Sequence, residues 1–410
     1  MKPSRASNAI ALPFESQDQY RQIVKDRFAF RSFVELSATR FPELFPCEFH
    51  KSGFTLHQIR HSSKLDLLLR RIKVKSTGQI LQIRPSFAMP YMTGQTEFVS
   101  KALYLRLWGV SFDALAYVFG RDAKYWERQW IALGRPSLVG SSIKRPEKLP
   151  MHIVADEKHT RLGGKTVYAP TTVAAGCIIG VTVTESASEE ALTEAYGEFA
   201  QEAKALDPSY SPESICLDGW SATQNAWKRL FPSITIVLCF LHSVLKVADS
   251  CLKRFGSLRK EVLDRAWNVY KATNKGEFSQ RIRRFREWTQ QSIKVGKLKA
   301  AILKLCNKRD QFSKSFDHPN AKRTSNMVDR LMNYQDRLLY AQRYFHGKIE
   351  TARLGLRAQA ILWNFHNYGE RQRRKKECGI SPFEDLNGFV YSENWLENFL
   401  IASSRGGKQM

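Results

Sequence analysis

The stretch SICLDGWSATQNAWKRLFPSITIVLCFLH, residues 214–242, lies in the middle of this 410-residue chain and alternates between two kinds of pattern. The apolar run at its start and the run ITIVLCF near its end predict two short buried strands. The segment SATQNAWKRLF between them predicts a helix. Strands that alternate with helices in this way are typical of an α/β fold.

The sequence before this stretch predicts three more strands and a helix. MHIVAD, KTVYAPTT and AAGCIIGVTVTES are strand-like, and the last of them ends near Ser186. The following segment, residues 186–206, is amphipathic, and Ser186 with Glu189 predicts a capping box at its start. The predicted order is therefore strand, strand, strand, helix, strand, helix, strand, helix.

Charge is distributed unevenly along the chain, whose formal net charge is +25. Residues 1–150 contain 24 basic and 12 acidic side chains, whereas residues 151–241 contain 6 basic and 11 acidic ones. Residues 242–376 contain 32 basic and 11 acidic side chains, and residues 377–410 contain 2 and 5. An acidic segment between two basic ones suits a nucleic acid held by flanking surfaces around a centre that binds cations. The simpler alternative is that the basic residues only solvate helices.

Other features of the composition exclude several classes of protein. The seven cysteines are odd in number and scattered, which does not indicate a disulfide framework. No apolar run reaches the length of about 18 residues that a membrane span needs, and the first residues lack a signal-peptide core. We therefore expect a soluble intracellular protein without a membrane partner. Cys47, His50, His57 and His61 are a possible zinc site, but their spacing is awkward and favours loop and surface histidines.

Two acidic residues end predicted strands that can lie side by side. Asp156 closes the first strand and Asp218 closes the fourth. Two unpaired carboxylates in one small volume repel each other, and burial raises the pKa of such a group. Mg²⁺ or Mn²⁺ resolves this repulsion, and two such ions about 4 Å apart can promote phosphodiester cleavage. Glu157 has no comparable partner, and we expect it to be structural.

The order of elements, with acids at these two positions, resembles the RNase H-like catalytic core of DDE transposases, and in detail the Mutator-like and related bacterial insertion-sequence transposases. In that superfamily the second acid is followed by a helix, a Phe-Pro-type turn, a strand and a Cys-x-x-His, as Phe231, Pro232, Cys239 and His242 provide here. The resemblance covers about residues 151–250. It implies a mixed five-stranded sheet with flanking helices and an all-helical insertion. The resemblance gives the Cys-x-x-His pair a role near the active site or in positioning a helix, rather than in a zinc site.

The third acid of this family lies on a helix after the insertion. The segment RTSNMVDRLMN, residues 323–333, is the best match and places Asp329 in this role. The family usually has Glu at this position, so Asp329 is a departure from the pattern. The alternative is Glu350 in HGKIETAR, which keeps the residue type but lacks the preceding motif. In the helix that follows, we expect Arg353 and Arg357 to solvate one face rather than to contact phosphate.

Residues 96–134 predict three short helices that break at Gly109 and Gly120, which matches a helix-turn-helix. An ordinary helical bundle is the alternative. The residues expected to contact DNA are Arg121, Lys124, Arg128 and Gln129 in the third helix and Arg281, Arg283 and Arg284 in the basic helical insertion.

The expected organisation has seven parts. They are a basic, partly β region (1–95), a helix-turn-helix (96–139), a linker rich in Pro, Ser and charge (140–150), the first part of an RNase H-like core (151–249), a basic helical insertion (250–320), a helix completing the core (321–370) and a C-terminal tail (371–410).

The resemblance implies a DDE-type transposase that uses Mg²⁺ or Mn²⁺, with two ions, to cut DNA and transfer strands. Its partners would be double-stranded DNA, both transposon ends and target, and further copies of the same chain. It would lie with the nucleoid in a bacterial cytoplasm, or in the nucleus of a eukaryote. Two alternatives stay open, namely a catalytically inactive DNA-binding protein derived from a transposase and a stand-alone RNase H-like nuclease.

Overall fold

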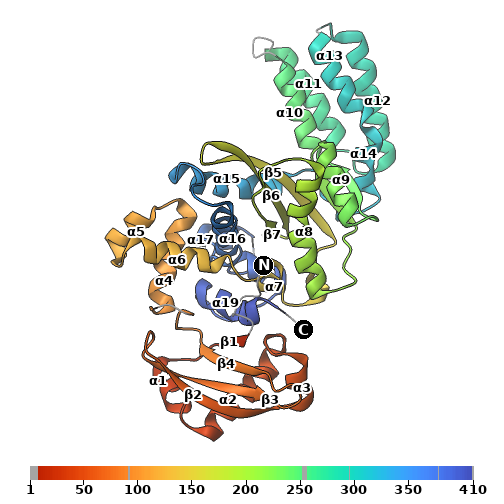
Figure 1. Ribbon diagram of the computed structural model, residues 1–410. Coiled ribbons are helices and arrows are strands. Elements are labelled where there is room, and N and C mark those ends of the chain that lie inside the picture. Colours follow the sequence, from red (N-terminus) through yellow and green to blue (C-terminus); the bar gives the residue numbers. More distant parts are fainter. Residues whose placement is uncertain (1–7, 91–92, 252–255, 295, 377, 409–410) are drawn as a thin grey trace.

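The computed structural model describes residues 8–90, 93–251, 256–294, 296–376 and 378–408. The chain has an α/β fold with two mixed sheets, one of four strands and one of five, and many helices (Figure 1). Among the described residues, no helix is both long and apolar enough to cross a membrane.

The four-stranded sheet belongs to the N-terminal part, which lies at one end of the molecule (Figure 1). Its strands are ordered β1-β4-β3-β2, and only the β1–β4 pair is parallel. The elements of this part are β1 (Ala9–Leu12), α1 (Gln17–Ile23), α2 (Arg27–Arg40), η2 (Pro42–Leu44), α3 (Cys47–Ser52), β2 (Phe54–Ser62), β3 (Leu67–Val74) and β4 (Ile80–Pro85).

The five-stranded sheet forms the centre of the molecule and confirms the mixed sheet that the sequence predicted. Its strands are β5 (His152–Leu162), β6 (Lys165–Ala174), β7 (Cys177–Val181), β8 (Ser214–Leu217) and β9 (Thr235–Leu238). Their order is β7-β6-β5-β8-β9, with antiparallel pairing of the first three and parallel pairing of β5 with β8 and β8 with β9. β5 extends beyond the predicted MHIVAD because it forms a long hairpin with β6.

Helices cover both faces of this sheet. α8 (Glu189–Leu206) and α9 (Ser221–Leu230) pack on one face, where Ile153 and Ala155 belong to their hydrophobic core. α15 (Asn326–Ala341) and α16 (Ile349–Phe365) pack on the other face, where Val154 points. The alternation of side chains along β5 separates these two cores. Ser188, rather than the predicted Ser186, caps α8 and accepts a hydrogen bond from the backbone N–H of Ala191.

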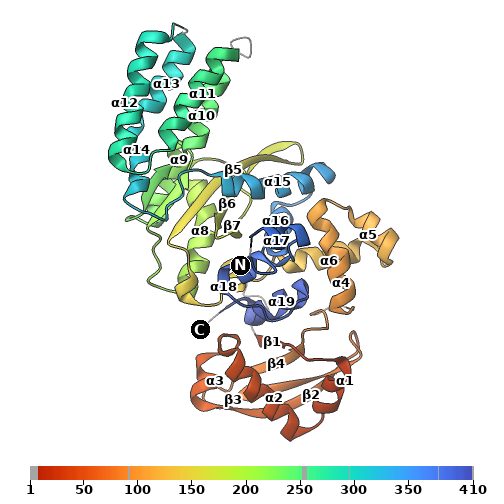
Figure 2. The ribbon, with the colours of Figure 1, turned by 180° about the vertical axis from the view of Figure 1, so that it is seen from behind.

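The basic helical segment forms a bundle that projects from the five-stranded sheet, with its base at α14 and η5 against β9 (Figures 1 and 2). The bundle begins within residues 151–249, which we expected to form the first part of the core, because α10 starts directly after β9. Its helices are α10 (Phe240–Ser250), α11 (Gly256–Tyr270), α12 (Lys275–Ser292), α13 (Gly296–Asn307) and α14 (Arg309–Ser313), followed by η5 (Lys314–Phe316).

The three helices expected in residues 96–134 are present. Gly109 and Gly120 end helical segments with positive φ angles, as a residue without a Cβ allows. The Ser111 hydroxyl caps the second helix by accepting a hydrogen bond from the backbone N–H of Ala114. The helices are α4 (Thr96–Tyr104), continued by η3 (Leu105–Trp108), then α5 (Phe112–Phe119) and α6 (Ala123–Leu133).

The segment predicted as a linker, residues 140–150, is instead part of the core. α7 (Leu138–Ser142) and η4 (Pro146–Lys148) cover this region, and Ile143 is fully buried. Lys144 is 2% exposed, and its Nζ donates hydrogen bonds to the backbone oxygens of Gly140 and Ala402. The prediction was wrong because carbonyls from a distant part of the chain satisfy the polar groups that suggested an exposed linker.

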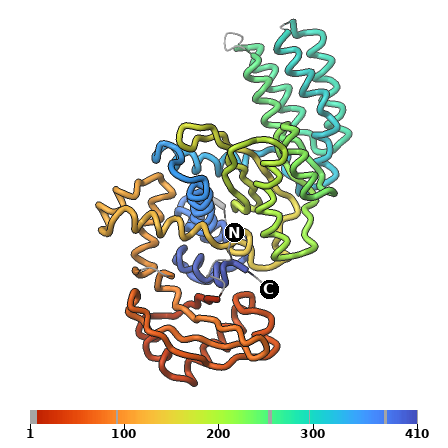
Figure 3. Tube along the Cα trace, viewed as in Figure 1, coloured from red at the N-terminus to blue at the C-terminus, as the bar shows by residue number. Residues whose placement is uncertain are grey.

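The segment predicted as a C-terminal tail, residues 371–410, is also a core element over the described part. Its last helical segments, within residues 382–406, lie between the two sheets and reach β1 (Figure 3). Phe383, Leu396 and Ile401 are fully buried there. These elements are α18 (Pro382–Asn387), α19 (Trp395–Ala402) and η6 (Ser404–Gly406), whereas α17 (Glu370–Lys376) is mostly exposed over its described side chains.

Candidate functional site

Three parallel strands end side by side at one edge of the five-stranded sheet. Val154 of β5 pairs with Cys216 of β8, and Cys216 pairs with Val237 of β9. The residues two positions further along the chain are Asp156 on β5, Asp218 directly after β8 and Cys239 directly after β9. Adjacent strands are about 4.8 Å apart, and residues two positions apart share a face. The sheet therefore brings Asp156 and Asp218 to equivalent positions on neighbouring strands.

A helix far along the chain completes this group. α15 packs on the face of the sheet that carries Val154 and brings Asp329 to Asp156. One ligand atom each from Asp156, His242 and Asp329 lies within 4.8 Å of the other two. Among the described residues, these form the one group of three or more His, Cys, Asp or Glu side chains close enough to share a metal ion. The sequence motif predicted both aspartates, but it left the role of His242 open.

Asp218 lies beside this group rather than within it. Its Oδ1 accepts a hydrogen bond from the backbone N–H of Trp220 at 2.8 Å, at the start of α9. Its charge nevertheless contributes to the raised pKa of Asp156, so the two carboxylates are electrostatic neighbours. The competing third acid, Glu350, is exposed in the first turn of α16 and does not join the group.

Cys239 fixes the start of the helix that carries Asp329. The backbone N–H of Ser325 donates to the sulfur of Cys239 at 3.2 Å. The Ser325 hydroxyl lies 3.2 Å from the same sulfur and donates to Oδ2 of Asp329 at 3.1 Å. The first member of the Cys-x-x-His pair thus positions the third acid. His242, the second member, places Nε2 at 3.9 Å from Oδ2 of Asp156.

Burial and mutual repulsion make these carboxylates weak acids. Burial raises the pKa of Asp156 to about 6, and the charges of Asp329 and Asp218 add to this effect, while His242 opposes it. Burial also raises the pKa of Asp329. Cys239, with the two carboxylates, raises the pKa of His242, although Nδ1 of this ring has no hydrogen bond of good geometry among the described residues. The group therefore favours additional positive charge, from protons or from a cation.

Glu157 points to the opposite face of β5, as expected for the next residue in a strand. Its Oε1 accepts hydrogen bonds from the hydroxyl of Tyr196 at 2.6 Å and from that of Thr223 at 2.7 Å. Burial raises the pKa of Glu157 to about 7. These contacts join β5 to α8 and α9, which is the kind of structural role that we expected.

The side chains expected to read DNA on α6 divide into two groups. Arg121, Lys124 and Arg128 are exposed, and Lys124 forms an ion pair with Glu127 of the same helix. Gln129 is fully buried, so it does not lie on the surface where we expected it. The helix turns it inward, next to Trp130 and Trp126, which form the buried face of α6.

Of the three arginines expected to contact DNA on α12, one is held within the bundle and two are exposed. Arg281 forms an ion pair with Glu277 and donates to the backbone oxygen of Asn268 at 2.6 Å. Arg283 is exposed, 3.7 Å from a carboxylate of α12, and Arg284 is exposed.

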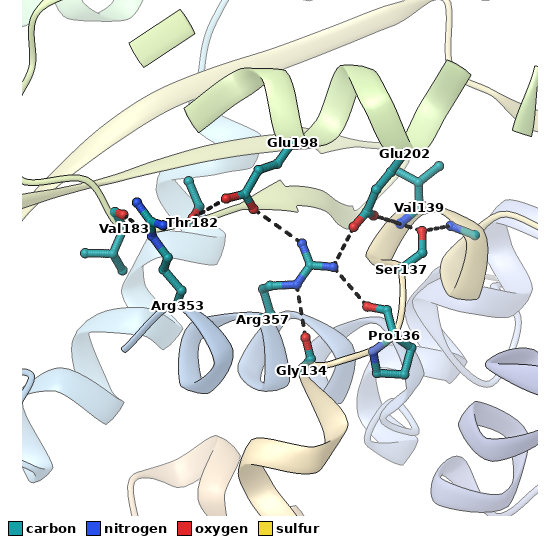
Figure 4. A network of polar contacts seen from close by, with 11 residues as sticks. Gly134, Pro136, Ser137, Val139, Thr182, Val183, Glu198, Glu202, Arg353 and Arg357 are labelled. Carbon is teal, nitrogen blue, oxygen red and sulfur yellow. Dashed lines mark hydrogen bonds and ion pairs between the residues drawn. The ribbon is translucent and has the colours of Figure 1, made fainter. Parts of the chain in front are cut away.

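A buried polar network replaces the solvated face that we predicted for α16 (Figure 4). Arg357 forms ion pairs with Glu202 at 2.6 Å and Glu198 at 3.7 Å, and its side chain is 12% exposed. It also donates to the backbone oxygens of Gly134 and Pro136. Arg357 therefore ties α16 to α8 and to the segment after α6, and it is not available to solvent or phosphate. The neighbouring Arg353 donates to the backbone oxygen of Val183 at 2.8 Å.

The possible zinc site near the N-terminus is not formed. Cys47 and His50 lie on α3, whereas His57 and His61 lie on β2, and among the described residues they make no group within metal-ligand reach. His61 is instead 3.0 Å from Oδ1 of Asp66.

The donor set of the Asp156, His242 and Asp329 group fits a divalent cation. Carboxylate oxygens are the ligands that Mg²⁺ prefers, and the span of 4.8 Å is little more than twice the Mg–O distance of about 2.1 Å. Burial raises the pKa of both carboxylates, so their negative charges are costly in this site without a partner.

Comparison of the chain with models of protein families gives no match, and comparison with curated protein sequences gives none either.

Proposed function

We propose that this protein is a DDE-type transposase that cuts DNA at transposon ends and transfers the freed strand to target DNA. The observation that carries the proposal is the meeting of Asp156 and Asp329, from a strand and a distant helix, beside the strand that ends in Asp218. Three acids from a sheet edge and a late helix are the arrangement that a DDE active site requires.

The architecture around the acids supports an RNase H-like core. Numbered along the chain from β5, the five strands lie in the order 3-2-1-4-5, and the acids belong to the first strand, the fourth strand and a helix on one face. The bundle α10–α14 occupies the chain between the second and third acids, where the family has its helical insertion. The short helices α4, α5 and α6 support a helix-turn-helix that presents Arg121, Lys124 and Arg128 to double-stranded DNA.

The chemistry assigned to these residues is metal-assisted phosphodiester cleavage. Asp156, Asp218 and Asp329 would hold Mg²⁺ or Mn²⁺, which supplies the positive charge that activates the attacking oxygen and stabilises the leaving oxygen. Ser325 orients the carboxylate of Asp329 through its hydrogen bond to Oδ2. Nε2 of His242 faces Asp156 and holds a proton when the carboxylates are without a cation.

The test uses the DNA that flanks the gene, inspected for inverted repeats bordered by direct repeats. With such repeats as substrate, Asp156→Asn and Asp218→Asn should abolish Mg²⁺-dependent strand cleavage and leave end binding nearly intact. Cleavage at the wild-type rate by either variant would refute the assignment. Asp329→Ala should lose cleavage and Glu350→Ala should keep it, because only Asp329 lies with Asp156.

A second candidate is a catalytically inactive DNA-binding protein derived from a transposase. It is favoured by the shorter Asp329 where Glu is usual, and by His242, whose positive charge can stand in for a cation beside Asp156. Nicking of a duplex that bears the correct ends, dependent on Mg²⁺ or Mn²⁺, would exclude this candidate. In either case the proposed partner is double-stranded DNA, bound by a homo-oligomer.

A further inference from the structure

A lysine from the helical bundle lies directly against the residue that follows Asp218. A Cβ atom added to Gly219 would lie 2.8 Å from Nζ of Lys308, so the ammonium group occupies the space that a larger residue would fill. Lys308 lies between α13 and α14, at the base of the bundle. The bundle and the acidic edge of the sheet therefore meet at this point.

Two more lysines share this neighbourhood. Burial lowers the pKa of Lys308, the charges of Lys246 on α10 and Lys304 on α13 lower it further, and Asp218 opposes them. Lys304 and Lys308 are four residues apart, and Lys246 is four residues after His242 of the acidic group. Residues at this spacing lie on one face of a helix. α10 and α13 pack against each other, so their lysines form one basic surface that continues from the acids.

These lysines are available to an external anion. Among the described residues, Lys246, Lys304 and Lys308 form no ion pair with a carboxylate within 4.0 Å, and no hydrogen bond of their Nζ atoms is present. Lys246 and Lys304 are exposed, and Lys308 is half-buried. The α12 arginine Arg281 differs in this respect, because Glu277 neutralises it.

We propose that Lys246, Lys304 and Lys308 form a phosphate clamp, which binds backbone phosphates of the DNA strand that enters the carboxylate site. The inference rests on the proposed function and adds where the strand is held. DNA that approaches the acids experiences their repulsion, and cations on one side of the site offset it. The clamp adds these lysines to the exposed α12 arginines, Arg283 and Arg284, as DNA contacts of the bundle.

The first test is the salt dependence of binding to a short DNA duplex of mixed sequence, measured by fluorescence anisotropy with the full chain. Each phosphate contact contributes about 0.9 to the slope of log K against log salt concentration. Replacing all three lysines by alanine should reduce this slope by between about 2 and 3 and weaken binding by about tenfold per lysine near 0.1 M salt.

The matched control removes the same charge elsewhere on the bundle. The control uses three exposed lysines: Lys260 on α11, Lys271 directly after α11 and Lys294 after α12. Replacing them by alanine should leave the slope of log K against log salt concentration within about 1 of the wild-type value. Equal losses in the two triple variants would overturn the clamp, because they would show a general effect of charge.

A second test uses the contact at Gly219. This glycine has no positive φ angle, so alanine is compatible with its backbone, and the new methyl group has to displace only the end of the Lys308 side chain. Gly219→Ala should slow cleavage by about tenfold in the wild type and by less than about twofold in a Lys308→Ala background, since contacting residues are energetically coupled. Equal effects in the two backgrounds would refute the placement of Lys308.

The two proposals fail in different ways. If the wild type cleaves DNA and the triple lysine variant binds like its control, the clamp is wrong and the transposase assignment stands. If the wild type does not cleave its ends but the clamp variant alone loses salt dependence, the catalytic assignment is wrong and the DNA-binding surface stands.

Discussion

Asp156→Asn should stabilise the metal-free protein, because the wild-type carboxylate is buried beside two other acids. The substitution keeps the shape of the side chain. Its Oδ1 can still accept the hydrogen bond that the backbone N–H of Glu157 donates at 2.9 Å. What it removes is a negative charge on a side chain that is 15% exposed. A residue retained for cation binding is expected to cost stability in this way.

The size and pH dependence of the effect follow from the pKa of Asp156, which burial raises from 3.8 to about 6. Because the folded protein binds the proton more tightly than the unfolded chain, the stability of the wild type falls as pH rises from about 4 to about 6. The shift corresponds to a loss of about 3 kcal/mol, complete above about pH 6. The asparagine variant should therefore gain up to about 3 kcal/mol near neutral pH and nothing below about pH 4.

Urea denaturation in the presence of a chelator, at several pH values, measures this difference as a change in the unfolding midpoint at constant m-value. Added Mg²⁺ should then stabilise the wild type and have little effect on the variant, because a ligand stabilises only the state that binds it. The control is Asp264→Asn on the exposed surface of α11, which should change stability by less than about 0.5 kcal/mol. Destabilisation by Asp156→Asn near neutral pH would show that its charge is a structural partner of His242, and the reasoning would fail.

Glu157→Gln keeps an acceptor for the hydroxyl of Tyr196 and removes the carboxylate whose pKa burial raises from 4.5 to about 7. The wild type should lose stability as pH rises from about 4.5 to about 7, and the variant should not; an unchanged pH profile in thermal melts would contradict this. Arg357→Met leaves Glu202, whose side chain is 21% exposed, without its cation, although Ser137 and Val139 still donate to it. The fold should lose about 3 kcal/mol in urea denaturation, and a loss below about 1 kcal/mol would mean that the network contributes little. Gln129→Met replaces a fully buried amide that makes no hydrogen bond of good geometry among the described residues. Calorimetry should give a free energy of unfolding equal to that of the wild type or about 1 kcal/mol higher. A clear loss of stability would show that the amide has a partner.

Local patterns in the sequence were sufficient for the central sheet and for the acids at its edge. Short apolar runs between turn residues predicted β5 to β9, because burial of both faces of a strand requires such runs. The same runs placed Asp156 and Asp218 at equivalent positions, since the register follows from where each strand begins. The helix that carries Asp329 was recognisable only through its resemblance to a family motif. That Asp329 would lie beside Asp156 was an expectation from the same resemblance.

Contacts between distant segments were beyond the reach of these patterns. Residues 140–150 have a polar composition typical of a linker, yet Lys144 is buried, and its Nζ donates a hydrogen bond to the carbonyl oxygen of Ala402. Arg357 has a polar side chain typical of surfaces, and the structure buries it where α8, α16 and the segment after α6 meet. A polar side chain is stable inside a protein when partners surround it, and the sequence does not reveal partners that lie a hundred or more residues away.

The difference between the features that the sequence predicted and those that it missed has a physical reason. The sequence by itself determined the five central strands, the helices within residues 96–134, 186–206 and 221–231, the glycine breaks and the acidic strand ends. These features depend on neighbouring residues and on burial of apolar side chains. Only the tertiary structure decided that His242 would face Asp156, that Lys308 would rest against Gly219 and that the C-terminal helices would fill the space between the sheets. Such contacts depend on the relative placement of whole elements, and that placement is set by packing over the entire chain.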